Sequence, residues 1–294
     1  MSVLSVRNLS KSFGAVKVIS NISFDVPEGS VFGFIGANGT GKTTTMKMIL
    51  GLLESDGGEI FVCGEKAVYG KTAKAVGYLP DVPEFYNYMR PMEYLTLCGE
   101  IWGMDRQKIK ERGKELLKLT GLSDVNRKIG GFSRGMKQRL GVAQALLGEP
   151  KLLICDEPTS ALDPAGRKEI LDILTEVKKR TTVVFSTHIL SDVERICDRV
   201  VFIHGGKTVL EGSVSEVKKR RAESYGAEFS DKAGAQKFSA LFKTENVSIS
   251  GNTVTVKNTD GGLLINKLAE NKLTPVRFER LESTLEDLFL EITA

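Results

Sequence analysis

The chain has no long apolar run and no recognisable leader. Its best apolar runs, Leu152–Cys155 and Val183–Phe185, are a few residues long, whereas a membrane-spanning helix needs about 18 consecutive apolar residues. The N-terminal stretch has no basic head followed by an apolar core, so the sequence predicts no signal peptide. These absences exclude a membrane-spanning protein and predict a soluble, cytoplasmic one.

Metal ligands, disulfide partners and excess charge are also scarce. The four cysteines form no CxxC pair and there are only two histidines, so we expect neither a disulfide framework nor a zinc site. Lys and Arg total 41 against 37 Asp and Glu, a net charge of +4, which gives no electrostatic reason to expect nucleic acid as a partner. The remaining composition, 41% hydrophobic and 27% charged, is typical of a globular protein.

Buried strands alternate with helices along most of the chain. Val31–Ile35, Leu152–Cys155 and Thr182–Ser186 are largely apolar, as strands covered on both faces are. Lys168–Lys179 has apolar residues on one helical face. This alternation predicts an α/β fold with a mostly parallel central sheet.

Other segments add to this core. Val3–Val6 and Val16–Val26 read as strands of an N-terminal β subdomain, and Met92–Leu147 has helical periodicity broken by glycines. The basic run Lys218–Arg221 marks a change in composition, and a small α+β pattern follows it. At roughly 150 residues per domain, the length favours about two domains. We predict a domain at 1–222 and a smaller one at 223–294.

A glycine-rich loop follows the strand at Val31–Ile35. It matches G-x-x-x-x-G-K-[ST] without a mismatch, and a helical pattern comes after it. In such a Walker A loop, successive N–H groups surround phosphate oxygens, and the helix N-terminus adds its positive dipole end. Lys42 can reach the β- and γ-phosphates, and the Thr43 hydroxyl can bind Mg²⁺. The predicted nucleotide-binding residues are Gly36, Ala37, Asn38, Gly39, Thr40, Gly41, Lys42, Thr43 and Thr44.

Two carboxylates end the strand at Leu152–Cys155. In an open α/β sheet, ligands bind outside the carboxyl ends of the strands, so Asp156 and Glu157 are expected beside the phosphate loop. Side chains of successive strand residues point in opposite directions. Asp156 can therefore contribute to a Mg²⁺ site while Glu157 polarises an attacking water.

Together these motifs resemble the ATP-binding subunits of ABC transporters. Phe132–Gln138 is similar to the family signature LSGGQ, Ser160–Asp163 to the D-loop, and Thr187-His188 to the switch histidine. Phe13 falls where the family keeps an aromatic residue that stacks on adenine. The resemblance covers about residues 1–220 and implies a P-loop NTPase core with a helical subdomain, ATP and Mg²⁺ as cofactors, and ATPase activity.

The resemblance also implies partners. Two such domains are expected to pair head to tail, so that Ser133 and Gly135 of one contact the γ-phosphate held by the other. His188 supports the water aligned by Glu157, and Asp163 carries information across the interface. The second subunit can be identical or different, and separate transmembrane permease subunits complete the transporter.

The sequence departs from the family pattern at two places. The signature has Arg134 and Met136 where the family has Gly and Gln, although Ser133 and Gly135 are retained. Asp81 stands where the Q-loop usually has glutamine. We expect Asp81 to take the Q-loop role at the metal site, together with Thr43 and Asp156, with altered metal dependence.

Aromatic residues mark the region where this family docks its membrane subunit. Tyr86, Tyr88, Tyr94 and Trp102 lie there and can supply partly exposed anchors, although for any one of them a place in the core of the helical subdomain is the better interpretation. The tail at Leu281–Glu291 resembles that of ABC-2 type exporter ATPases. Its role stays open between dimer contact and regulation.

The leading interpretation is an ATPase subunit that powers transport, with export favoured, from the inner face of the cell membrane. The alternative is a soluble ABC-type ATPase acting on ribosomes or DNA. Such proteins usually carry two nucleotide domains or a long insertion, and this chain has one phosphate loop. A P-loop kinase leaves the signature, the D-loop and His188 unexplained. The transported substrate is not encoded here.

Overall fold

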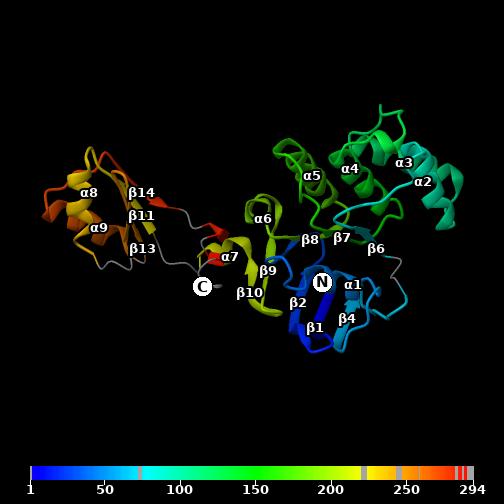
Figure 1. The fold of residues 1–294 in the computed structure, drawn as a ribbon, viewed down its shortest axis with the longest axis horizontal. Helices are drawn as coiled ribbons and strands as arrows, with labels where there is room; N and C mark the ends of the chain where they lie inside the picture. The colour runs from blue at the N-terminus through cyan, green and yellow to red at the C-terminus, as the bar shows by residue number, and fades with distance from the viewer. Residues whose placement is uncertain are drawn as a thin grey trace. The chain divides into compact units, whose positions relative to one another are not determined.

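The computed structural model describes residues 2–71, 75–219, 224–242, 247–257, 259–281, 284–286 and 288–289. The chain divides into two compact units, Met1–Val214 and Ser215–Ala294 (Figure 1). The domain boundary predicted between residues 222 and 223 lies outside the described residues.

The centre of the first unit is a mostly parallel sheet. Its strand order is β10-β9-β3-β8-β7-β6, in which β9, β3, β8, β7 and β6 run parallel and β10 is antiparallel to β9. Every residue of β3 and β7 is buried, because layers cover both faces of the sheet. The predicted α/β class is confirmed. The strands are β3 (Val31–Ile35), β6 (Val76–Leu79), β7 (Leu152–Asp156), β8 (Thr182–Thr187), β9 (Arg199–His204) and β10 (Lys207–Ser213).

An antiparallel sheet covers one face of this centre (Figure 1). Its order is β2-β1-β4-β5, and Phe24 on it stacks on Phe32 of the central sheet with ring centroids 5.7 Å apart. The first strand is longer than predicted, because it pairs with β2 as far as Phe13. Helix α1 (Lys42–Ile49) lies on the same side and buries Met46 and Ile49. The strands are β1 (Ser2–Phe13), β2 (Val16–Pro27), β4 (Gly57–Val62) and β5 (Glu65–Lys66).

Helices lie on the other side of the central sheet (Figure 1). The predicted helical stretch at 92–147 forms separate helices, because Gly103 and Gly121 adopt left-handed φ values of 73° and 64° that end them. Asp105 and Ser133 cap the helices that follow, each accepting from backbone N–H groups of the first turn. The helices are α2 (Pro91–Ile101), α3 (Arg106–Leu119), α4 (Arg134–Ala145), α5 (Pro164–Val177), α6 (Leu190–Ile196) and a 3₁₀ turn at Ile129–Gly131.

The second unit is a small α+β domain. Its antiparallel sheet has the order β12-β13-β11-β14, and its core holds Phe229, Phe238, Val254 and Leu264. No helix among the described residues of either unit has the length and apolar character needed to cross a bilayer. The elements are α7 (Val214–Lys219), which begins at the last residue of the first unit, β11 (Ser224–Glu228), α8 (Lys232–Ser239), β12 (Val247–Ser250), β13 (Thr253–Lys257), α9 (Gly261–Glu270) and β14 (Arg277–Leu281).

Gly77 on β6 permits the close approach of strand and helix, which makes it a test of this packing. A Cβ at this position would overlap the carbonyl oxygen of Ala145 and lie 3.0 Å from Pro150 Cγ. Gly77→Ala is expected to destabilise the first unit by about 1–3 kcal/mol, as overpacking does, and to lower the melting temperature by several degrees. Gly57→Ala is the matched control, since a Cβ there meets nothing within 4 Å. Equal melting temperatures for the two variants would contradict this packing.

Candidate active site

The phosphate loop connects β3 to α1 at the carboxyl end of the central sheet. Gly39 and Gly41 have φ values of 81° and 95°, which L side chains rarely adopt. A Cβ on Gly36 would also meet the carbonyl oxygen of Ile203 at 2.7 Å. Ala37, Asn38 and Gly39 are exposed. The loop therefore has the backbone form that the sequence predicts, with its tip open to a ligand.

Lys42 lies inside this loop. Its Nζ donates to the carbonyl oxygens of Gly36 at 2.8 Å and Ala37 at 3.1 Å, and it lies 3.0 Å from Glu157 Oε1. Only 5% of the Lys42 side chain is exposed. Three oxygens thus surround the ammonium group, so an incoming phosphate must take over part of this contact shell. Thr43 is exposed at the start of α1, and Thr44 is half-buried.

The two carboxylates at the end of β7 have different surroundings. Asp156 is buried, and its Oδ1 accepts from Ser186 Oγ on β8 at 2.6 Å. Glu157 has a left-handed φ of 48°, and its N–H donates to the carbonyl oxygen and the hydroxyl of Ser186 at 3.1 and 3.0 Å. A strained backbone held by neighbours is common at functional sites. Ser186 was not among the predicted site residues. Its position as a polar residue in an otherwise mostly apolar strand could have indicated it.

His188 completes a cluster of three polar side chains. Its Nδ1 lies 3.0 Å from Glu157 Oε2, so each carboxylate oxygen of Glu157 contacts a different partner, Lys42 or His188. The three residues follow β3, β7 and β8, which are neighbours in the sheet order β3-β8-β7. The fold thus brings together three residues that belong to separate motifs in the sequence.

The signature and D-loop residues lie at helix starts. Ser133 Oγ accepts from the N–H of Met136 at 3.2 Å at the start of α4, and nothing lies within 4 Å of a Cβ on Gly135. Asp163 Oδ1 accepts from Gly166 N–H at 3.0 Å at the start of α5. In the part of the chain that the structure describes, no hydrogen bond or ion pair joins Ser133 or Gly135 to the Lys42–Glu157–His188 cluster.

Asp81 has partners other than the expected ones. Its Oδ1 accepts a hydrogen bond from Ser160 Oγ and lies 3.4 Å from Arg134 NH2. Among the described residues, no recorded bond links it to Thr43 or Asp156. It is nevertheless near the strand-end carboxylates: burial, and then negative charge that includes Asp156 and Asp81, raises the pKa of Tyr78 to about 12.

The predicted aromatic residues occupy two places. Tyr86 lies close to Tyr88 and Tyr94, with ring centroids 5.8 and 6.4 Å apart; Tyr86 and Tyr88 are exposed and Tyr94 is buried. Trp102 is half-exposed and lies against Gly148 instead.

Phe13, the residue predicted to stack on adenine, ends β1 with half of its surface exposed, and Lys11 Nζ lies 5.6 Å from its ring centroid. Its ring can therefore accept a stacked base.

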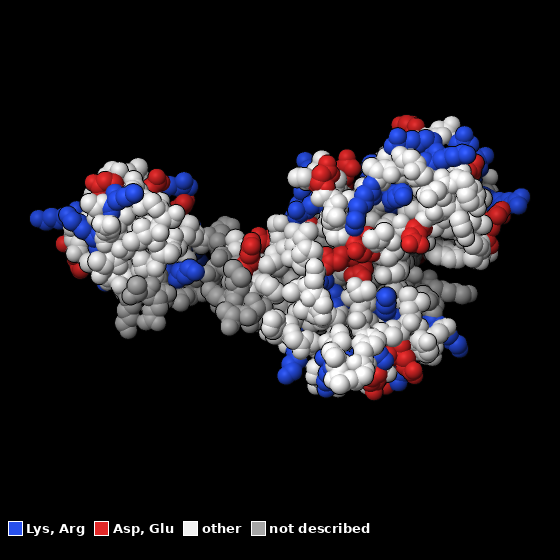
Figure 2. All heavy atoms as spheres, in the orientation of Figure 1, with Lys and Arg blue, Asp and Glu red and all other residues white. Residues whose placement is uncertain are grey.

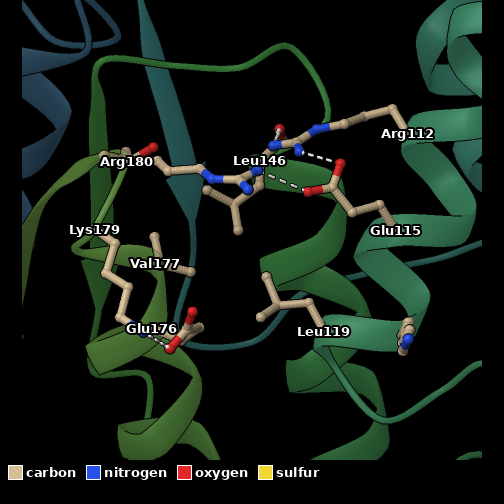
Figure 3. Close-up of a pocket in the computed structure, with 10 residues that line it drawn as sticks. Arg112, Glu115, Leu119, Leu146, Glu176, Val177, Lys179 and Arg180 are labelled. Atoms are coloured by element: carbon tan, nitrogen blue, oxygen red, sulfur yellow. Dashed lines mark hydrogen bonds and ion pairs between the residues drawn. The ribbon is translucent and has the colours of Figure 1, made fainter.

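A separate hollow of about 450 Å³ lies among α3, the end of α4 and the end of α5. Figure 3 shows Arg112 and Arg180 both directed at Glu115, with Lys179 paired to Glu176. The Arg112 side chain holds the pKa of Glu115 below its usual value by a hydrogen bond. In these ion pairs the basic side chains are already bound to carboxylates. The hollow is therefore a poorer candidate for ATP than the phosphate loop.

Comparison with known proteins agrees with this geometry. A family model described as ABC transporter matches residues 19–160, which include the phosphate loop, the signature and the strand-end carboxylates. The ABC transporter ATP-binding protein YxlF of Bacillus subtilis is 38% identical over 295 residues, covering 99% of each chain. The chain belongs to the ABC transporter family. It is the ATP-binding, ATP-hydrolysing subunit of such a transporter, as the motifs predicted.

Two further proteins are similar to this ABC ATPase. The Nod factor export ATP-binding protein I of Burkholderia lata is 35% identical over 99% of this chain and 96% of its own. The solved structure of cbiO1 from Clostridium perfringens, described as part of the ABC transporter complex cbiONQ, is 27% identical. It has a TM-score of 0.69 and covers 74% of this chain and 90% of its own.

Proposed function

We propose that this ABC ATPase powers export through separate membrane subunits, with Glu157 as the residue that activates water. The observation that carries the catalytic part is the contact of Glu157 with both Lys42 and His188 at the carboxyl end of the sheet, with oxygen–nitrogen distances of 3.0 Å. A general base must lie within hydrogen-bond reach of the water it activates. Glu157 is next to the phosphate-binding lysine and is held by two neighbours.

The donors beside the loop fit Mg²⁺. This ion prefers oxygen ligands and usually takes one or two carboxylates plus substrate phosphates. Asp156 is buried with its Oδ1 bonded to Ser186, no hydrogen bond within the described part of the chain engages its Oδ2, and Thr43 is exposed. When bound, the ion neutralises phosphate charge. We assign it to Thr43 and Asp156, whereas the recorded partners of Asp81 favour another role for that residue.

Different residues of the chain bind ATP, activate water and contact the second subunit. The N–H groups of the loop and Lys42 bind the β- and γ-phosphates, and Phe13 stacks on the base. Glu157 accepts a proton from the water that attacks the γ-phosphate, the bond between the γ-phosphorus and the β,γ-bridging oxygen breaks, and ADP leaves. His188, oriented by Glu157, donates a hydrogen bond to the γ-phosphate. Ser133 and Gly135 serve the ATP of a second subunit in a head-to-tail dimer, because an open helix N-terminus attracts anions. Asp163 lies at the interface.

Two relatives support the membrane partner and the direction of transport. The name of the Burkholderia lata protein specifies export, and cbiO1 is part of a transporter complex. Tyr86 and Tyr88 are exposed neighbours in the helical region, which suits a docking surface for a permease. We place the protein on the inner face of the cell membrane, held there by that partner.

Membrane recovery tests this assignment. When the chain is co-expressed with a multi-spanning protein encoded beside it, we expect both to co-purify from detergent-solubilised membranes. Tyr86→Ala/Tyr88→Ala is expected to reduce the recovered subunit at least fivefold. Tyr69→Ala is the control, since Tyr69 is 61% exposed and lies outside the tyrosine cluster. Tight association with ribosomes or DNA, without a membrane partner, would contradict the proposal.

A further inference from the structure

The two departures from the family pattern meet in space. Asp81, in the Q-loop position, lies 3.4 Å from the guanidinium of Arg134, which replaces the signature glycine. Ser160 of the D-loop donates to the same Asp81 oxygen and lies 3.5 Å from Arg134 NH2. One acidic and one basic replacement are therefore partners, although they are 53 positions apart in the chain.

The pair lies at the edge of the sheet where phosphate is expected. Parallel strands β6 and β7 pair as far as Leu79 and Cys155, so Asp81 and Glu157 each follow the carboxyl end of one of these two neighbouring strands. Burial and then the negative charges of Asp156 and Asp81, among others, raise the pKa of Tyr78, the residue that precedes Leu79 on β6. Figure 2 shows acidic and basic side chains adjoining in the middle of the larger unit. Asp81 thus adds a third carboxylate to a site that must receive a polyanion.

Folding stability does not explain the pair. Arg134 and Asp81 are 46% and 47% exposed, and exposed ion pairs contribute little to stability. Arg134 is also the first residue of α4, where a positive charge opposes the helix dipole. A cation is therefore unfavourable for the helix at this position, whereas it favours an anion bound at the helix start.

We propose that Arg134 is the counter-charge of Asp81, and that the pair sets the affinity of the ATP-bound dimer. With Arg134 present, the carboxylate of Asp81 is neutralised, and the phosphates bind at the strand ends and at Ser133 without net repulsion. Without Arg134, Asp81 repels them. Both residues are positioning residues that act through charge. This inference rests on the proposed function, because it requires ATP bound between two subunits.

The test is a double-mutant cycle in Glu157→Gln, with the ATP concentration for half-maximal dimerisation as the readout. Arg134→Gln is expected to raise this concentration about tenfold, the effect of one uncompensated charge in a partly exposed site. Asp81→Asn is expected to lower it about two- to threefold, since it leaves the positive charge of Arg134 uncompensated beside the phosphates. Asp81→Asn/Arg134→Gln is expected to return it to within about threefold of the parent. Arg134→Lys, which keeps the charge, is expected to stay within about threefold as well.

Three other outcomes would contradict the pairing, the charge role of Arg134 or the proposed function. If the double variant is as impaired as Arg134→Gln, Arg134 acts independently of Asp81 and the pairing is wrong. A fall of more than about 5 °C in the melting temperature of Arg134→Gln would make its role structural, because a half-exposed pair should change it by about 2 °C or less. If Glu157→Gln forms no dimer at any ATP concentration, the proposed function itself fails, and this inference fails with it.

Discussion

Glu157→Gln is expected to lower ATP turnover about 10²- to 10⁴-fold, the contribution typical of a positioned general base. Glutamine keeps the size of the side chain and can still contact His188, but it cannot accept the proton of the attacking water. ATP binding should persist, because Lys42 and the loop N–H groups are unchanged. The ATP-bound dimer is therefore expected to accumulate. Phosphate release measures the first effect, and size-exclusion chromatography with ATP measures the second.

The matched control for this variant is Glu59→Gln. Glu59 is an exposed carboxylate that pairs with Lys66 at 2.6 Å on the N-terminal sheet. The ATP turnover of Glu59→Gln should therefore equal that of the wild type. His188→Ala should impair turnover less than Glu157→Gln. The histidine only donates a hydrogen bond to the γ-phosphate, whereas Glu157 accepts the proton of the attacking water. Normal phosphate release by Glu157→Gln would rule out the assigned base.

Lys42→Ala is expected to weaken ATP binding about 100-fold. The ammonium group has three oxygen neighbours in the free protein, and phosphate oxygens replace part of this shell when ATP binds. Each charge-assisted hydrogen bond contributes about 1.5–3 kcal/mol, and two lost bonds, partly offset by release from the present partners, give this magnitude. Titration with a fluorescent ATP analogue measures the affinity.

Lys47→Ala controls for the loss of a positive charge from the same helix. Lys47 is exposed in the last turn of α1, so its removal should leave ATP affinity within about twofold of the wild type, as expected for a distant, screened charge. Lys42→Ala also leaves Glu157 Oε1, which is buried, without its cation. Unchanged affinity in Lys42→Ala would refute the nucleotide site at this loop.

The parts of the fold that the sequence predicted correctly have local signals. The strand at Val31–Ile35 is apolar throughout, and the structure places a fully buried strand at the same residues. Gly103 and Gly121 end helices because their positive φ values suit glycine. The strands β9 and β10 were not predicted, although Gly205-Gly206 in the turn of their hairpin was a local signal. The pairing of β9 with the distant strand β3 has no such signal.

The same division holds for the candidate site. Spacing alone predicted the phosphate loop, because Gly36, Gly41 and Lys42 stand at the fixed positions of a motif whose backbone N–H groups surround an anion. The partners of Asp81 and the contact of Trp102 with Gly148 were not predictable. Each depends on which way a side chain points and on which distant segment lies there.

The sequence by itself determined the chemistry available at the site, since loop geometry, helix starts and strand-end carboxylates depend on residues close together in the chain. Only the tertiary structure decided which of these groups act together. The sheet order β3-β8-β7 differs from the order of these strands in the sequence, and that crossover brings Glu157 to within 3.0 Å of both Lys42 and His188. In the same way, the β6–β7 register and the start of α4 bring Asp81 to Arg134, so two isolated departures from a motif become one ion pair.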